Sequence, residues 1–176
     1  MKGQPSLFSE EPRYCMDTNV IVSFMRGTDD EHYGADVFAP QWHYIEGLIA
    51  SGAIVAPRQV ELELEKWCKT IADLRVWIKK YRHMFLGVDS DAQLQSAKRI
   101  VNKYPVYGST PNFLGDLEVI TLADSLAITV ISLEGENQNS SQRRPKIPNV
   151  CREFGIGYVS LPGFLRRENF GQSPPN

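Results

Sequence analysis

Short apolar runs alternate along the chain with longer segments of helical periodicity. Four runs have the length and composition of buried strands, at residues 13–16, 53–56, 128–132 and 157–160. Between these runs, apolar residues recur every three or four positions, which is the spacing of an amphipathic helix. Strands that are apolar throughout are typical of a parallel sheet covered on both faces. The pattern therefore predicts an α/β protein with a central parallel sheet flanked by helices.

The predicted helices are bounded by glycine, proline and polar turns. We expect them at residues 20–25, 40–51, 60–67, 71–81, 91–104, 116–126, 150–154 and 162–170. Pro57 follows the second predicted strand and is expected in the first turn of the next helix, where a missing N–H is tolerated. Three tryptophans, Trp42, Trp67 and Trp77, lie on apolar helical faces, so we expect them in the core.

Length and composition indicate one ordinary globular domain. The chain has 176 residues, of which 42% are hydrophobic and 23% charged, and this excludes a disordered, collagen-like or coiled-coil protein. Residues 1–12 are polar with two prolines and predict a flexible arm, and residues 171–176 predict a flexible tail. The domain itself is expected to span residues 13–170.

Charge, cysteine content and hydropathy further limit the classes of protein to which this chain can belong. The 19 basic and 21 acidic residues give a net charge of −2, so any nucleic-acid binding must come from a local patch. Three cysteines without CxxC spacing predict neither a disulfide framework nor a zinc ribbon. No signal peptide and no bilayer-length apolar run are evident, so we expect a cytoplasmic protein without a membrane segment.

Four acidic residues recur at comparable places in the alternation. Asp17 follows the first strand, Glu63 lies early in the helix after the second, Asp116 opens the helix before the third, and Glu134 lies just past that strand. In a parallel sheet these positions share the carboxyl edge. Carboxylates gathered there repel one another unless a cation lies between them. Ligand sets made only of oxygen suit Mg²⁺ or Mn²⁺.

Each acid also has a purely structural interpretation. Asp17, Asn19 and Asp116 are candidates to cap the helices beside them, since aspartate and asparagine are favoured at N-caps. Glu63 is one of several glutamates expected on a solvated face, and Glu134 lies in a polar loop. These interpretations account for the residues singly but not for their recurrence at one edge.

Several segments resemble a known family. Residues 14–21, with the turn Asp17-Thr18-Asn19, resemble the opening strand and turn of PIN-domain nucleases. Residues 36–42, 57–64, 129–132 and 144–151 are similar to one uncharacterised prokaryotic PIN-like family. The resemblance covers about residues 13–167 and implies a three-layer PIN-like fold with a central parallel sheet.

The resemblance implies a metal-dependent ribonuclease that hydrolyses RNA phosphodiester bonds with Mg²⁺ or Mn²⁺. Asp17, Glu63 and Asp116 would take the places of the three acids that the family retains. Glu134 would be the fourth acid, with Glu136 as the other candidate. Many PIN domains are toxins of toxin–antitoxin pairs, so the expected partners are RNA, an antitoxin protein and a second copy in a homodimer.

Two further groups of residues complete the predicted site. The resemblance implies that three further residues support the acids or contact phosphate, namely Thr18, Asn19 and Ser132. The loop after Glu134 begins at the sheet edge where the acids are expected, and it contains the basic residues Arg143, Arg144 and Lys146. We therefore expect these three side chains to bind phosphate.

Other classes of protein are compatible with parts of this pattern. A phosphatase with Asp17 as nucleophile would need a second acid two residues later, where this chain has Asn19, and a phosphoacceptor receiver domain needs an acid pair at the first strand. A catalytically weak or inactive PIN-like module that binds RNA or protein is the main alternative.

Overall fold

The sheet is five-stranded and entirely parallel. The computed structural model describes residues 9–135 and 141–171. Its strands are β1 (Tyr14–Met16), β2 (Ile54–Pro57), β3 (Phe85–Leu86), β4 (Thr129–Ser132) and β5 (Tyr158–Ser160). They lie in the order β3-β2-β1-β4-β5, so β1 is central and pairs with both β2 and β4. The predicted parallel α/β architecture is confirmed.

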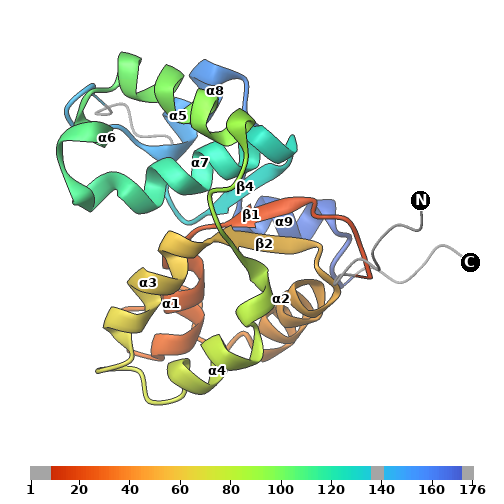
Figure 1. The fold of residues 1–176 in the computed structure, drawn as a ribbon. Coiled ribbons are helices and arrows are strands. Elements are labelled where there is room, and N and C mark those ends of the chain that lie inside the picture. Colours follow the sequence, from red (N-terminus) through yellow and green to blue (C-terminus); the bar gives the residue numbers. More distant parts are fainter. Residues whose placement is uncertain (1–8, 136–140, 172–176) are drawn as a thin grey trace, which may run out of the picture.

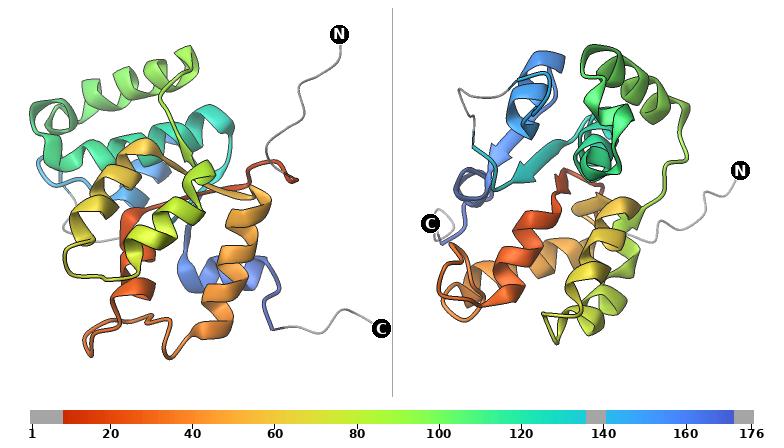
Figure 2. Two further views of the ribbon diagram at one scale, coloured as in Figure 1. Left: turned by 60° about the horizontal axis from the view of Figure 1, so that its bottom comes forward. Right: turned by 90° about the vertical axis from the view of Figure 1, so that its left-hand side faces the viewer.

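Helices cover both faces of the sheet (Figures 1 and 2). One layer contains α1 (Thr18–Arg26), α2 (Ala39–Ser51), α3 (Arg58–Trp67) and α4 (Leu74–Lys80). The other contains α5 (Asp91–Lys103), α6 (Val106–Ser109), α7 (Leu114–Leu126) and α8 (Ile147–Phe154). The last helix, α9 (Leu161–Arg167), lies against β4 and β5, and two short 3₁₀ helices are η1 (Arg82–Met84) and η2 (Pro111–Phe113).

The central strands form the middle of the core. Cys15 is opposite Val55 of β2 and Val130 of β4, and none of the three side chains is exposed to solvent. Because helices bury both faces, successive residues of each strand are apolar instead of alternating with polar ones. All three cysteines are free thiols, as their number and spacing predicted.

Several predicted element boundaries are wrong in instructive ways. Pro57 is the last residue of β2, next to Leu86 of β3, because its fixed φ of −72° suits an extended chain. The two-residue strand β3 is too short to leave a recognisable pattern. The helix predicted at 71–81 begins only at Leu74, and α8 begins three residues before the expected Val150 because Pro148 fits its first turn.

Aromatic side chains stack through the helical layer that contains α1, α2 and α4. The ring of Phe24 lies 4.8 Å from Trp42, which lies 5.6 Å from Trp77, which in turn lies 5.0 Å from Tyr81. Trp42 and Trp77 are each 5% exposed, so their predicted core positions are confirmed. Trp67 is only partly buried and packs at the margin of this core.

Both ends of the described chain are attached to the domain. Ser9 and Glu10 belong to the segment predicted as a flexible arm, and both donate hydrogen bonds to the Ser51 carbonyl. The rest of the predicted arm and most of the predicted tail, residues 1–8 and 172–176, lie outside the described residues. Near the other end, Glu168 accepts hydrogen bonds from Arg13 at 2.6 Å and Tyr14 at 2.7 Å. Within the described part of the chain, no helix is both long and apolar enough to cross a membrane.

The Glu168 contacts predict a measurable contribution to stability. Glu168→Ala leaves the Arg13 guanidinium and the Tyr14 hydroxyl without their shared acceptor, so we expect the free energy of unfolding to fall by about 1–3 kcal/mol. Urea unfolding measures the change. Glu10→Ala is the matched control, because it removes only the exposed 3.4 Å pair with the same Arg13, for which we expect under about 1 kcal/mol. Equal losses in the two variants would contradict this account.

Candidate active site at the carboxyl edge of the sheet

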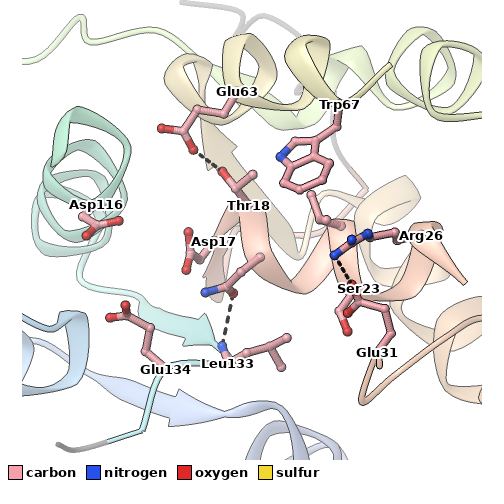
Figure 3. A pocket seen from close by; sticks show the side chains of 12 residues that line it. Asp17, Thr18, Ser23, Arg26, Glu31, Glu63, Trp67, Asp116, Leu133 and Glu134 are labelled. Atoms are coloured by element: carbon pink, nitrogen blue, oxygen red, sulfur yellow. Dashed lines mark hydrogen bonds and ion pairs between the residues drawn. The ribbon is translucent and has the colours of Figure 1, made fainter. Parts of the chain in front are cut away.

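A pocket opens where the strand order reverses, between the carboxyl ends of β1 and β4. Open parallel sheets bind ligands at such switch points, because the loops after neighbouring strands diverge there. The pocket has a volume of about 370 Å³. All four acids predicted from the sequence line it, namely Asp17, Glu63, Asp116 and Glu134. Figure 3 shows these side chains reaching the pocket from four different segments.

The four carboxylates share the pocket without forming a closed ligand set. Among the residues that the structure describes, no three Asp, Glu, His or Cys side chains are grouped so that they could hold one metal ion. Glu136, the other candidate for the fourth acid, lies outside those residues. The carboxylate oxygens of the four acids suit a hard divalent cation. As they stand in the structure, the four groups do not enclose one.

Asp17 is almost completely buried and is held by the neighbouring strand. It is 5% exposed, and one of its oxygens accepts a hydrogen bond from the Ser132 hydroxyl at 2.9 Å. Burial raises its pKa to about 7, aided by the charges of Glu134 and Glu63 and opposed by the Ser132 hydrogen bond. Asp17 occupies the N-cap position of α1, but its side chain makes no capping hydrogen bond there. Capping therefore does not explain this residue.

Asp116 experiences the same combination of burial and repulsion. Burial raises its pKa to about 8, together with the charges of Asp17, Glu134 and Glu63, while Lys146 acts in the opposite direction. It is the third residue of α7, whose N-cap is Phe113, so the interpretation of Asp116 as an N-cap is wrong. Because the pKa of both Asp17 and Asp116 is raised, the pocket disfavours the charged form of each of these carboxyl groups.

Thr18 and Gly115 determine where the Glu63 carboxylate lies. The Thr18 hydroxyl donates to Glu63 Oε2 at 2.5 Å. A Cβ atom built on Gly115 would overlap with Glu63 Oε1, so the glycine allows the carboxylate to pack against the start of α7. Glu63 is consequently held beside Asp116 instead of extending into solvent.

Asn19 and Ser132 connect the segments that follow β1 and β4. The Asn19 carboxamide oxygen accepts a hydrogen bond from the Leu133 N–H at 3.2 Å, and its nitrogen donates to the Ser132 hydroxyl at 3.4 Å. The Glu134 N–H also donates to Ser132, at 3.1 Å. These contacts fix the turn after β4 against the start of α1, which sets the position from which Glu134 reaches the pocket.

Glu134 already has two partners on the protein. Lys146 donates to its Oε1 at 2.9 Å, and the Ile147 N–H at the start of α8 donates to its Oε2, also at 2.9 Å. Lys146, for which the sequence predicts phosphate binding, is paired in the structure with this pocket acid. Arg143 and Arg144 are exposed on the turn before α8 and are not among the residues lining the pocket.

Three features of this site were not predicted from the sequence. Trp67 lines the pocket, with the guanidinium of Arg26 5.5 Å from its ring centre. Gly115 was not among the residues predicted for the site, although its position next to Asp116 was an available signal. The Tyr107 hydroxyl is buried without a hydrogen-bond partner among the described residues, and nothing in the sequence marked it.

Fold and pocket together define a parallel α/β protein with an acidic pocket at its topological switch point. Over residues 14–171 the sequence matches the model of a family described as "Domain of unknown function (DUF4411)", and the chain belongs to that family. The match covers nearly the span predicted as the domain. No curated protein matches the chain.

The raised pKa values predict how stability depends on pH without metal. Between about pH 4 and pH 8 the folded protein binds protons on Asp17 and Asp116 that the unfolded chain has released, so their contribution lowers stability as pH rises through this window. In EDTA, Asp116→Asn removes one such group and should make the protein more stable at pH 8 by on the order of 1–3 kcal/mol, with little effect at pH 4.5. Urea unfolding across this range tests the prediction.

The control for this experiment is Asp29→Asn, which changes an exposed aspartate in the loop after α1. It should follow the parent at every pH. A stability difference between Asp116→Asn and the parent that does not grow between pH 4.5 and pH 8 would show that Asp116 is not repelled in the folded state.

Proposed function

We propose that this protein is a Mg²⁺- or Mn²⁺-dependent nuclease that hydrolyses phosphodiester bonds in RNA. The observation that carries the proposal is the convergence of four carboxylates from four segments on one pocket at the switch point. Burial and mutual repulsion raise the pKa of two of them, and a divalent cation would relieve both effects. The resemblance of residues 14–21 to PIN-domain nucleases supports the same chemistry.

Asp17, Glu63 and Asp116 are the residues that would hold the cation, with Glu134 as the fourth acid. Binding must draw these carboxylates together, because no three of the described acids are grouped for it as they stand. When bound, the cation supplies Lewis-acid activation of water and neutralises charge on the phosphate. The proposed reaction requires no nucleophile from a protein side chain.

The surrounding residues have definite tasks in this proposal. Ser132 orients Asp17 through its hydrogen bond, and Thr18 does the same for Glu63. Lys146 places a positive charge beside Glu134 and near Asp116, where it can meet a phosphate oxygen. Each of these groups is held in place before substrate arrives, which lowers the cost of organising the site during the reaction.

The structure argues against a phosphatase that uses Asp17 as nucleophile. Such an enzyme needs an acid/base group two residues later, and that position is Asn19. Both ends of the Asn19 carboxamide are engaged, with Leu133 and Ser132, in holding the turn after β4. A carboxamide in this position cannot transfer a proton as the mechanism requires.

One observation favours the alternative of a PIN-like module that binds RNA or protein without cleaving it. The Lys146–Glu134 pair neutralises one acid of the pocket and occupies one of its oxygens. If that pair persists, three carboxylates are left to bind a cation, and the site attracts cations more weakly. Toxin activity, an antitoxin partner, a homodimer and phosphate binding by Arg143 and Arg144 stay predictions from the sequence.

Nuclease activity predicts a joint dependence on metal and on Asp17. Mn²⁺ should raise the melting temperature of the parent by mass action, and the parent should cleave a labelled single-stranded RNA. Asp17→Asn should lose most of the Mn²⁺-induced shift and lower the cleavage rate by about a hundredfold or more. Asp29→Asn should behave as the parent in both assays. Metal-dependent stabilisation without cleavage would favour the non-cleaving module, and equal Mn²⁺ shifts in Asp17→Asn and the parent would overturn the metal site.

Gly115 offers a test that changes none of the proposed ligands. Gly115→Ala places a methyl group where the Glu63 carboxylate now lies, so the carboxylate must move away from Asp116. We expect Mn²⁺ affinity to weaken by about tenfold, or about 1.4 kcal/mol, while stability in EDTA is kept because alanine favours the helix. Calorimetric Mn²⁺ titration measures this. The matched control is Gly47→Ala in α2, where a Cβ meets nothing within 4 Å. Unchanged Mn²⁺ affinity in Gly115→Ala would remove Glu63 from the site.

A further inference from the structure

A second hollow adjoins the acidic pocket on the side of α3 and η2. Its volume is about 400 Å³, and Gln59, Lys66, Pro111 and Asn112 line the part that the acidic pocket does not share. Four residues border both hollows, namely Thr18, Glu63, Trp67 and Asp116. A ligand held at the carboxylates can therefore extend from one hollow into the other past Trp67.

The second hollow differs chemically from the first. Outside the shared border it contains two carboxamides, from Gln59 and Asn112, and the exposed ammonium group of Lys66. Carboxamides both donate and accept hydrogen bonds, so they can pair with the polar edge of a nucleobase. An indole offers a flat face on which any base can stack. The proposed metal chemistry uses none of these groups.

Trp67 differs from the other two tryptophans in a way that suits this role. Trp42 and Trp77 are buried and stack on each other in the core, whereas Trp67 is partly exposed between the two hollows. Its ring is held beside the guanidinium of Arg26, which is itself fixed by Glu31 at 3.1 Å (Figure 3). The indole is thus positioned before any ligand binds, and it lines both hollows.

We propose that the hollow formed by Gln59, Lys66, Trp67 and Asn112 is a nucleobase subsite. It binds the base of the nucleotide next to the phosphate held at the carboxylates, with the base stacked against Trp67 and its edge within reach of the carboxamides. Lys66 contacts the phosphate on the outer side of that nucleotide. The identity of the ligand rests on the proposed nuclease function, whereas the place and chemistry of the subsite rest on the hollow itself.

Tryptophan fluorescence tests the subsite directly, because two of the three indoles are shielded in the core. The probes are a single-stranded hexamer of adenosine ribonucleotides and a hexamer with the same ribose-phosphate backbone but no bases. Binding is measured with Ca²⁺ in place of Mg²⁺ to prevent cleavage. We expect the base-containing hexamer to quench the fluorescence of the parent and the abasic hexamer to have no such effect. Trp67→Phe should lose the quenching while still binding the hexamer.

Affinity measured by fluorescence anisotropy of a labelled hexamer gives a second readout. Trp67→Ala should weaken binding by about tenfold or more, in line with the loss of one stacked base. Asn112→Ala should weaken binding while keeping the quenching, and it does so without altering an aromatic residue. Leu62→Ala is the control, because this exposed residue of α3 lies outside both hollows.

The subsite is wrong if the parent shows no quenching, if the abasic hexamer quenches equally, or if Trp67→Phe keeps the signal. Its failure is distinguishable from failure of the nuclease proposal. A parent that cleaves RNA in Mn²⁺ without a Trp67 signal overturns the subsite alone. A Trp67 signal without Asp17-dependent cleavage upholds the base-binding hollow and overturns the nuclease.

Discussion

Repulsion between carboxylates that share one pocket is the constraint around which the carboxyl edge of this protein is organised. Burial raises the pKa of both Asp17 and Asp116, and the charges of Glu134 and Glu63 raise it further. Apolar side chains at these positions would stabilise the fold more than the carboxylates do, since burying a charge is costly unless it is paired. The neighbouring contacts hold the acids in place despite this cost. Ser132 binds Asp17, Thr18 binds Glu63, and Lys146 binds Glu134.

This arrangement explains why the site lies between β1 and β4. Asp17 belongs to the start of α1 and Glu134 to the turn after β4, and Asn19 and Ser132 link the two segments by hydrogen bonds. The layers on opposite faces meet at the same edge, because the helix that carries Glu63 contacts the helix that carries Asp116. The four carboxylates thus place negative charge in one pocket, and either a cation or protonation can neutralise it.

Four of the five strands, and the edge on which the acids gather, could be predicted from sequence because they depend on local patterns; the two-residue β3 could not. Apolar runs such as residues 53–56 predict buried strands, and parallel strands bring their carboxyl ends to one edge. The pairing of Lys146 with Glu134 could not be predicted, since it depends on how the loop before α8 folds back. The same holds for Gly115 and Trp67, whose importance arises only from the contact between α3 and α7 and from the hollows beside it.

The central claim is that these carboxylates share one divalent cation. A crystal of the protein soaked in Mn²⁺, with anomalous diffraction data collected at the manganese edge, tests it most directly. The account predicts an anomalous peak in the pocket within coordination distance of Asp17, Glu63 and Asp116, about 2.0–2.3 Å from their oxygens. A structure at saturating Mn²⁺ in which these three residues bind no ion would contradict the claim.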